Sequence, residues 1–586
     1  MNSVTSRYDR FPYVRVTANN ADCSAGWESI REILSLSPGV TVLELYPGCN
    51  ADEIESHLLP SLQPDCILRS QDAILTPAEL NEKFSQSLGN DPVFAMMCPW
   101  ELKDFFCPTK LAYLQSQLEK AQFHAKKRVL IIGTGASLIA PQPDCLIYAD
   151  LARWEIQKRY RAHQAGNLGG GDGHASPAAL YKRAFFLDWR AADRLKARLL
   201  PRIHYLLDTN TTNAPKMISG AHFRLGLRTA SQQPFRVVPF FDPGPWGGQW
   251  MKEKFQLPED SSNYAWCFDC VPEENSLLLA FGDHRVEIPA MDLVLFCPQE
   301  LLGDSIYREF GAEFPIRFDY LDTMGGGNLS LQVHPLQEYI REKFGMDYTQ
   351  DESYYILEAA DNGVVYLGLK ENVDQQKMEH DLRRAQQDAD APFPAQNYVN
   401  VWPAKKHDHF LIPAGTIHCS GRNGVVLEIS ATPYIFTFKL WDWGQLGLDG
   451  HPRPIHLNHG LANIQWGRTT AWVREHLINQ VSVIVTAPDW REEKTGLHAL
   501  GFIETRRHWF TGVVPHNTAG TVNVLNLVEG DAAIVESPTG DFPPFTVHFG
   551  ETFIVPAQVG AYTVRPATPT DKPLATMKAF VREASE

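Results

Sequence analysis

Two short stretches of this sequence carry side chains that bind metal ions, and both have the pattern of β-strands. In residues 329–335 polar and apolar side chains alternate. Residues at positions i, i+2 and i+4 of a strand face the same side, so we expect Ser330, Gln332 and His334 to share one face. A second stretch reads Ile-Pro-Ala-Gly-Thr-Ile-His and ends at His418. This pattern predicts a β-barrel whose interior holds a polar site.

Four side chains are the predicted ligands of one divalent ion: Gln332, His334, Glu352 and His418. Zinc accepts imidazole nitrogen and carboxylate oxygen, and a catalytic zinc site leaves one position open for water or substrate. Gln332 would bind through its amide oxygen, a weaker ligand that keeps the metal electrophilic. A single strand histidine is more typical of a hydrogen-bonded core residue, and Glu352 alone would suit a solvent-facing position. The joint placement of all four favours a metal site.

The elements that must position these side chains change character along the chain. Residues 1–230 are predicted to form an α/β domain, with buried strands such as 128–132; the sequence does not indicate the function of this domain. Over 235–460, short strands separated by turn residues predict a jelly-roll domain, interrupted by a charged, helix-favouring insertion at 371–392. From about residue 475 the chain again looks all-β. The predicted fold is therefore multidomain, with an N-terminal α/β domain followed by all-β jelly-roll domains.

A glycine turn at 133–137, Gly-Thr-Gly-Ala-Ser, follows a predicted strand of the α/β domain. The backbone amides of such a turn could cradle a phosphate. The turn lacks the Gly-Lys-Ser/Thr ending of a P-loop. A tight strand-to-helix turn is the favoured interpretation, and a degenerate nucleotide-binding domain is the alternative.

Composition limits the class of protein. The chain has 586 residues, of which 44% are hydrophobic and 21% charged, as in soluble globular proteins. No apolar run approaches the roughly 18 residues of a membrane helix, and the first residues lack a signal-peptide core, so we expect a cytoplasmic location. A net charge of −16 disfavours binding to nucleic acid or to acidic membranes. Ten scattered cysteines do not predict a disulfide scaffold. Cys267 and Cys270 form a single CxxC motif, and we expect both to be buried thiols. The oligomeric state stays open.

Eight motifs follow one another in a fixed order after residue 235. They lie at 245–248 (Pro-Trp-Gly-Gly), 314–317, 329–335 (with Ser-Leu-Gln-Val-His-Pro), 351–357, 413–418, 427–429, 439–444 and 449–456. Over roughly 235–456 the chain resembles the type I mannose-6-phosphate isomerases, a family of zinc cupins. The resemblance is less distinct from there to 586 and does not cover the first 230 residues.

The resemblance implies one zinc ion per chain, held by Gln332, His334, Glu352 and His418. It also implies that 461–586 is a second, metal-free cupin-like lobe. The implied reaction interconverts mannose 6-phosphate and fructose 6-phosphate through a cis-enediol. A cation suits this chemistry because negative charge develops on adjacent sugar oxygens, and a water-poor pocket strengthens its stabilisation.

Four more residues are candidates for work on the substrate. Glu428 and Lys439 are the candidate catalytic residues, although a strand glutamate beside a basic neighbour would explain Glu428 nearly as well. Ser330 is expected to bind substrate or phosphate, with a packing role as the alternative. Arg453 is the remaining candidate for binding the substrate.

The chain departs from the family pattern at three places that concern the substrate. Gln350 stands where the family tends to place lysine. Lys439 stands where the family usually has arginine, and lysine lacks the planar guanidinium fork that holds two oxygens. Between Glu428 and Lys439 there is an apparent one-residue insertion, with Thr432-Pro433-Tyr434 in place of the usual aspartate. Phosphate recognition needs converging cations or amides. Two alternatives follow: an isomerase of another sugar, including a non-phosphorylated one, or a sugar-sensing cupin without turnover. Each predicts a small sugar or sugar phosphate as partner.

Overall fold

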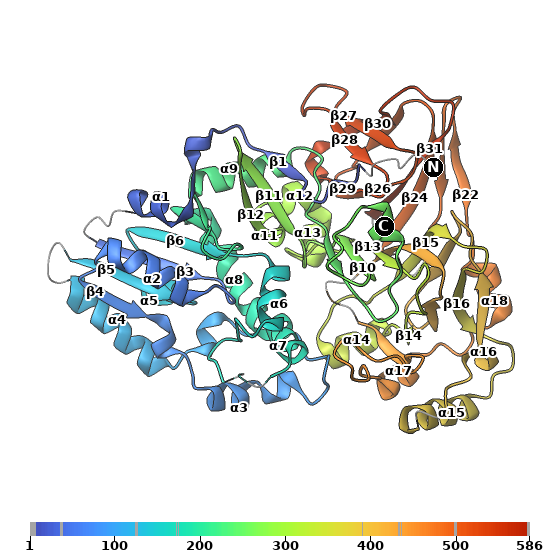
Figure 1. Cartoon of the computed structure of the whole chain (residues 1–586), viewed down its shortest axis with the longest axis horizontal. Helices are drawn as coiled ribbons and strands as arrows, with labels where there is room; N and C mark the ends of the chain where they lie inside the picture. Colours follow the sequence, from blue (N-terminus) through green and yellow to red (C-terminus); the bar gives the residue numbers. More distant parts are fainter. Residues whose placement is uncertain are drawn as a thin grey trace. The chain divides into compact units, whose positions relative to one another are not determined.

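The computed structural model describes residues 7–34, 39–122, 127–171, 173, 175–388, 391–431, 434, 436–496 and 501–582. The chain forms two compact units (Figure 1). The α/β unit comprises Tyr13–Ala230 and Glu273–Cys297, and the β unit comprises Met1–Pro12, Ser231–Pro272 and Pro298–Glu586. Among the described residues, no helix has both the length and the apolar character that crossing a membrane requires.

A seven-stranded sheet with the order β2-β8-β7-β6-β3-β5-β4 forms the centre of the α/β unit. Its strands are β2 (Cys23–Ala25), β3 (Gly39–Leu45), β4 (Cys66–Arg69), β5 (Arg128–Gly133), β6 (Cys145–Asp150), β7 (Tyr205–Asp208) and β8 (Lys216–Ser219). The five strands from β7 to β4 pair in parallel, whereas β8 pairs antiparallel with both of its neighbours, β7 and β2. Six of the seven residues of β3 are buried, as expected for a strand covered on both faces.

Helices and a small second sheet complete the α/β unit. The helices are α1 (Gly26–Ile33), α2 (Ala51–Leu62), α3 (Pro77–Leu88), α4 (Pro108–Gln122), α5 (Ala136–Ile139), α6 (Arg153–Arg161), α7 (Pro177–Arg183), α8 (Trp189–Leu199), α9 (Gly220–Ser231) and α11 (Met291–Phe296). The small sheet has the order β1-β11-β12, with β1 (Tyr13–Arg15), β11 (Ser276–Phe281) and β12 (His284–Pro289). Residues 273–297, which lie inside the predicted range 235–460, thus pack within the α/β unit. The three-domain division stays a prediction.

The glycine turn between β5 and α5 is closed by a carboxylate of the chain itself. Glu44 at the end of β3 accepts hydrogen bonds from the backbone amides of Gly135 at 2.5 Å and Ser137 at 2.7 Å. Burial raises the pKa of Glu44 to about 7, against the effect of these hydrogen bonds. The amides that the sequence offered as a phosphate cradle are therefore engaged by Glu44.

Two sheets make the first lobe of the β unit. One has the order β18-β15-β20-β13-β10-β9 and the other β17-β16-β19-β14-β21. The strands are β9 (Phe240–Asp242), β10 (Trp266–Cys270), β13 (Arg317–Asp322), β14 (Leu331–Val333), β15 (Glu352–Ala359), β16 (Val364–Leu369), β17 (Val399–Pro403), β18 (His409–Ile412), β19 (His418–Ser420), β20 (Gly424–Ser430) and β21 (Phe438–Trp441). Cys267 and Cys270 are buried free thiols on β10.

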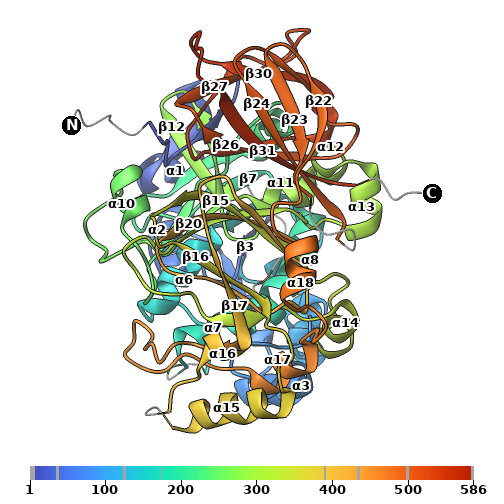
Figure 2. The ribbon, with the colours of Figure 1, turned by 90° about the vertical axis from the view of Figure 1, so that its right-hand side faces the viewer.

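The second lobe contains a six-stranded sheet, β22-β23-β24-β31-β26-β29, and a four-stranded sheet, β25-β30-β27-β28. The strands are β22 (Ser482–Thr486), β23 (Trp490–Lys494), β24 (Ile503–Phe510), β25 (Val514–Asn517), β26 (Asn523–Glu529), β27 (Ala532–Glu536), β28 (Phe545–His548), β29 (Thr552–Val555), β30 (Ala561–Pro566) and β31 (Leu574–Val581). Figure 2 shows β24, β31 and β26 side by side. An apolar core that includes Phe510, Leu525 and Val564 joins the two sheets.

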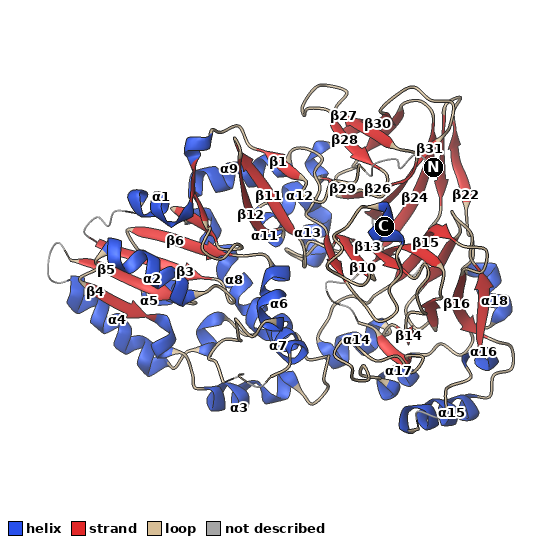
Figure 3. Cartoon of the chain, in the orientation of Figure 1, coloured by secondary structure: helices blue, strands red, loops and turns tan. Residues whose placement is uncertain are grey.

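The helices of the β unit connect these strands (Figure 3). They are α10 (Trp250–Lys254), α12 (Pro298–Leu302), α13 (Asp304–Phe310), α14 (Gln337–Phe344), α15 (Gln375–Gln387), α16 (Ala395–Tyr398), α17 (Leu457–Asn463) and α18 (Thr470–His476). Helix α15 lies within the predicted insertion and begins where the Asp374 side chain accepts from the Lys377 amide at 3.0 Å, a typical N-cap. The predicted combination of α/β and β-rich parts is confirmed. The assignment of the sheets to cupin domains stays a prediction.

Candidate metal centre

Strand pairing in the first lobe brings the predicted ligands together from both sheets. Gln332 on β14 is directly opposite His418 on β19 and Lys439 on β21. His334 follows β14 immediately. Glu352 comes from the other sheet, where it is the first residue of β15. The polar face predicted for residues 329–335 thus meets a carboxylate from the facing sheet.

Three of the four predicted ligands converge on one point. The Nε2 atom of His334 lies 3.0 Å from Oε2 of Glu352, and Nε2 of His418 lies 2.9 Å from Oε1 of the same carboxylate. All three side chains have 0% exposure to solvent. Their ligand atoms lie within 4.8 Å of one another.

Backbone carbonyls determine which imidazole nitrogen faces the site. Nδ1 of His334 lies 2.8 Å from the carbonyl oxygen of Phe436, and Nδ1 of His418 lies 2.9 Å from that of Thr416. Since a carbonyl oxygen only accepts, each Nδ1 must carry the hydrogen. Each neutral ring then presents the lone pair of Nε2 to Glu352.

This arrangement fits a cation. Despite the short contacts, Nε2 of His334 and Oε1 of Glu352 are buried without a hydrogen bond, and a buried polar group left without a partner costs roughly 1–3 kcal/mol. Burial would raise the pKa of Glu352, and the two facing imidazoles, when protonated, hold that pKa well below its ordinary value; with neutral rings, a bound cation would supply the positive charge that the carboxylate needs. Two imidazole nitrogens and a carboxylate are ligands that zinc accepts. The His-Glu-His group can therefore bind a metal ion.

Gln332 lies beside the group, but its amide oxygen faces away from it. That oxygen accepts a hydrogen bond from Ser330 Oγ at 3.0 Å, while the amide nitrogen lies 3.1 Å from Nε2 of His418. The oxygen and nitrogen of an amide are assigned from their hydrogen bonds. Ligation through oxygen needs the opposite orientation, in which Ser330 would accept from the amide nitrogen. Ser330, which is 1% exposed, thus contacts Gln332, and its predicted role with substrate stays a prediction.

Further carboxylates line the inner face of the larger sheet. Glu428 on β20 is directly opposite Asp319 on β13 and Tyr354 on β15. Burial and then the charges of Asp319 and Glu352 raise the pKa of Glu428 well above its ordinary value. The pKa of Asp319 is raised to about 6 by burial and by Glu352, against the effect of Arg317. The carboxyl group of Glu428 thus holds its proton to unusually high pH.

Gln350 connects two of these carboxylates. Its amide nitrogen donates to Oε2 of Glu352 at 2.8 Å and reaches Oε1 of Glu428 at 3.5 Å. From the sequence, Gln350 was noted only because it stands where the family tends to place a lysine. Asp319 was not predicted as a site residue. A detectable signal was the alternation of Arg317 and Asp319 with apolar residues on a buried strand.

The two predicted cations differ in their engagement. The ammonium of Lys439 forms no hydrogen bond or ion pair with any residue that the structure describes, and burial, with Arg453 nearby, lowers its pKa to about 8. Arg453 instead donates two hydrogen bonds to Asp442, at 2.7 and 2.5 Å. Its fork is therefore already bound. Thr432 and Pro433 of the predicted insertion lie outside the described residues.

Comparison with known proteins separates the two parts of the chain. A family model described as a domain of unknown function (DUF8485) matches residues 26–232. A mannose-6-phosphate isomerase from Streptococcus mutans is 23% identical over 249 residues, 42% of this chain and 72% of that protein. Mannose-6-phosphate isomerase ManA from Bacillus subtilis is 23% identical over 245 residues, 40% of this chain and 68% of that protein.

Two solved structures are similar over a larger share of the chain. The mannose 6-phosphate isomerase from Bacillus subtilis has 16% identity and a TM-score of 0.48, covering 59% of this chain and 99% of that one. A zinc-bound mannose 6-phosphate isomerase has 13% identity and a TM-score of 0.45, covering 60% and 100%. The resemblance to type I mannose-6-phosphate isomerases is thus confirmed over part of the chain at low identity. These relatives leave the rest uncovered.

Proposed function

We propose that this chain is a zinc-dependent aldose–ketose isomerase that converts mannose 6-phosphate to fructose 6-phosphate through a cis-enediol. One observation carries the proposal: two buried imidazole nitrogens and a buried carboxylate meet at 2.9 and 3.0 Å. The names of its relatives supply the substrate. In this proposal one zinc ion per chain is held by His334, Glu352 and His418, with Gln332 completing the set after its amide turns.

The reaction moves one proton between adjacent carbons. Bound zinc would supply stabilisation of the negative charge that develops on the two neighbouring sugar oxygens. Glu428 takes the proton from C2 and returns it to C1, while a hydroxyl proton passes from O2 to O1. Glu428 acts in its ionised form, and burial, which raises the pKa of this carboxyl group above its ordinary value, makes the carboxylate a stronger base for the C2 proton. Gln350 orients Glu428 and Glu352 relative to each other.

Lys439 is the proposed phosphate ligand. Its ammonium lies in the first lobe without a partner among the described residues, on the strand that pairs with Gln332. The carboxylate of Asp442 acts on this ammonium only through its charge and already accepts from Arg453, so Lys439 is available to an anionic substrate group. Arg453 can join it only by releasing Asp442.

A second candidate is an isomerase of a sugar without phosphate. The observation that favours it is the double hydrogen bond between Arg453 and Asp442, which leaves Lys439 as a single cation. Gln350 adds an amide where a further cation would have supported phosphate binding.

Solvent exchange at C2 tests both candidates. Zinc-loaded protein is incubated in deuterated water with mannose 6-phosphate or with mannose, and deuterium in the recovered sugar is measured. The first proposal expects deuterium in the phosphorylated sugar, with His334→Ala and Glu352→Ala inactive and low in zinc. Ser353→Ala is the matched control, because Ser353 is adjacent on β15, is equally buried and points to the opposite face. Exchange in mannose alone would support the second candidate, and exchange in neither would overturn both.

A further inference from the structure

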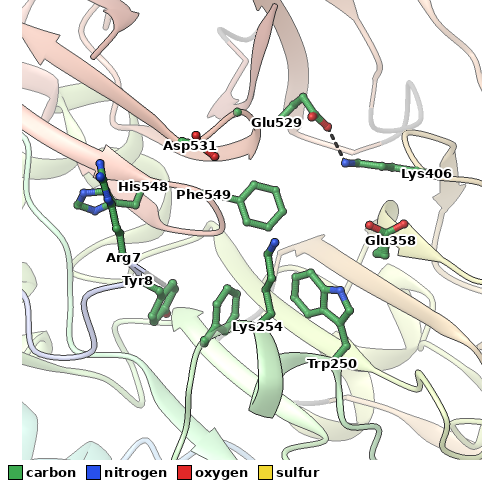
Figure 4. A pocket seen from close by; sticks show the side chains of 12 residues that line it. Arg7, Tyr8, Trp250, Lys254, Glu358, Lys406, Glu529, Asp531, His548 and Phe549 are labelled. Carbon is green, nitrogen blue, oxygen red and sulfur yellow. Dashed lines mark ion pairs between the residues drawn. The ribbon is translucent and has the colours of Figure 1, made fainter. Parts of the chain in front are cut away.

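A cavity of about 280 Å³ lies in the β unit, and none of the predicted metal or substrate residues lines it (Figure 4). Its wall includes Trp250 and Lys254 from α10, Glu358 from β15, and the turns that carry Asp531 and Phe549. The volume is near the lower end for small-molecule pockets, which hold roughly 300–1,000 Å³. The cavity therefore suits a single small ring better than a dinucleotide.

Two cations line this cavity without a charged partner. Neither Arg7 nor Lys254 forms an ion pair or side-chain hydrogen bond with any residue the structure describes. Lys254 Nζ lies 5.2 Å from the centroid of the Phe549 ring, a cation–π distance. By contrast, Lys406 at the rim is paired with Glu529 at 2.6 Å. Arg7 and Lys254 are thus available to an anionic group.

Two carboxylates in the same cavity limit what that ligand can be. Asp531 makes no side-chain hydrogen bond or ion pair within the described chain, and Glu358 accepts only from the Ala359 amide at 3.4 Å. In Figure 4, Arg7 and Glu358 lie on opposite sides of Phe549. A ligand that is anionic throughout would meet repulsion from these carboxylates, and a purely apolar ligand would offer none of the four charged groups a hydrogen-bond partner. The ligand must offer hydrogen-bond donors as well as an anion.

Aromatic rings supply the apolar part of the wall. The centroids of Trp250 and Phe549 lie 6.3 Å apart, and both side chains are only half-buried. Behind them, Tyr8 stacks on Phe255 with centroids 4.2 Å apart. Partly exposed rings of this kind pack against the C–H face of a sugar ring while hydroxyl groups at its edge reach polar neighbours.

The segment that carries Arg7 is held against both lobes of the β unit. The Tyr8 hydroxyl donates to Asp269 at 2.5 Å, and the Asp9 amide donates to Glu551 at 2.6 Å. Arg236 also donates to the Asp9 carbonyl at 2.8 Å. This anchoring lowers the conformational entropy that Arg7 must lose when it engages a ligand.

We propose that this cavity binds a monophosphorylated sugar, separately from the metal centre. Arg7 and Lys254 hold the phosphate, Asp531 and Glu358 accept hydrogen bonds from hydroxyl groups, and Trp250 and Phe549 cover one face of the ring. The proposal does not depend on the isomerase activity.

Calorimetric titration of the full, zinc-loaded chain tests the proposal. The titrants are fructose 6-phosphate, fructose and inorganic phosphate. Lys254→Ala and Trp250→Ala are each expected to weaken binding at one class of fructose 6-phosphate sites by about tenfold or more. Lys254→Ala removes a charge-assisted hydrogen bond to phosphate, and Trp250→Ala removes an aromatic ring that covers one face of the sugar. Lys405→Ala is the matched control: it removes an exposed cation next to Lys406 that does not line the cavity.

The outcomes separate this site from the metal centre. A protein that binds fructose 6-phosphate in a Lys254-dependent manner, yet exchanges no proton at C2, would support the cavity and overturn the isomerase. Equal affinities for fructose 6-phosphate in Lys254→Ala, Trp250→Ala and Lys405→Ala would overturn the cavity site, whatever the activity. Inorganic phosphate binding as tightly as fructose 6-phosphate would overturn sugar recognition.

Discussion

Lys439 is the proposed phosphate ligand whose charge changes in an accessible pH range. Burial, with Arg453 nearby, lowers the pKa of Lys439 to about 8, whereas an ordinary lysine titrates near about 10.4. A phosphate ester loses its second proton at lower pH, with a pKa of about 6. Between about pH 7 and about pH 9 the lysine therefore loses its charge while the phosphate keeps its own.

The size of the effect follows from the bond that is lost. A hydrogen bond to a charged group contributes about 1.5–3 kcal/mol, which corresponds to about 10- to 100-fold in affinity. We expect KM for mannose 6-phosphate to rise by about tenfold or more from about pH 7 to about pH 9, with a smaller change in kcat. A change of pH therefore removes and restores the charge of Lys439 without a mutation.

Two variants and one assay separate this cause from others. Initial rates with mannose 6-phosphate are measured across the range for wild type, Lys439→Met and Lys439→Arg. Lys439→Met is expected to have a high KM at every pH, because no cation is left to titrate. Lys439→Arg is expected to keep its KM low throughout, because arginine stays protonated. A wild-type KM that stays flat, or a Lys439→Met variant that matches wild type at neutral pH, would refute the role of Lys439.

Three further predictions concern other residues. Ser330→Ala is expected to weaken zinc binding by about 10- to 100-fold without abolishing it, measured by competition with a chelator, since it orients Gln332. Asp319→Asn is expected to move the acidic limb of the kcat profile to lower pH, because it removes a charge that raises the pKa of Glu428; an unmoved limb would contradict this. Glu44 has a folded pKa raised to about 7, so wild-type stability should fall as pH rises from about 4.5 to about 7, by about 3 kcal/mol. Hydrogen exchange in the α/β unit should show this loss in wild type and not in Glu44→Gln.

The sequence predicted which side chains of residues 329–335 share a face of the candidate metal centre, because alternation along one strand is a local property. The alternation in residues 329–335 sets which side chains share a face, and a strand pairing then adds His418 opposite Gln332. The period of a strand is two residues, so the face could be assigned without knowing the partner strand. The α15 helix within the predicted insertion is another local feature, with its N-cap at Asp374.

The features that escaped prediction depend on which strands become neighbours. Asp319 joins the site because β13 pairs with β20, and this register cannot be read from either strand alone. Arg453, which was predicted to bind the substrate, instead donates hydrogen bonds to Asp442. Glu44 reaches amides about ninety residues away, as its hydrogen bond with Gly135 spans 91 positions. Each case is a tertiary contact between polar groups, and the sequence around one group does not specify its partner.

X-ray absorption at the zinc edge identifies the atoms that bind zinc in the proposed metal centre. Wild-type protein loaded with one zinc per chain is expected to show two imidazoles and a carboxylate oxygen in the first shell. His418→Ala should retain at most one imidazole signal and bind zinc far more weakly, and Glu352→Ala should lose the ion. Wild-type zinc content and an unchanged first shell in either variant would contradict the assignment of His334, Glu352 and His418 to one metal centre.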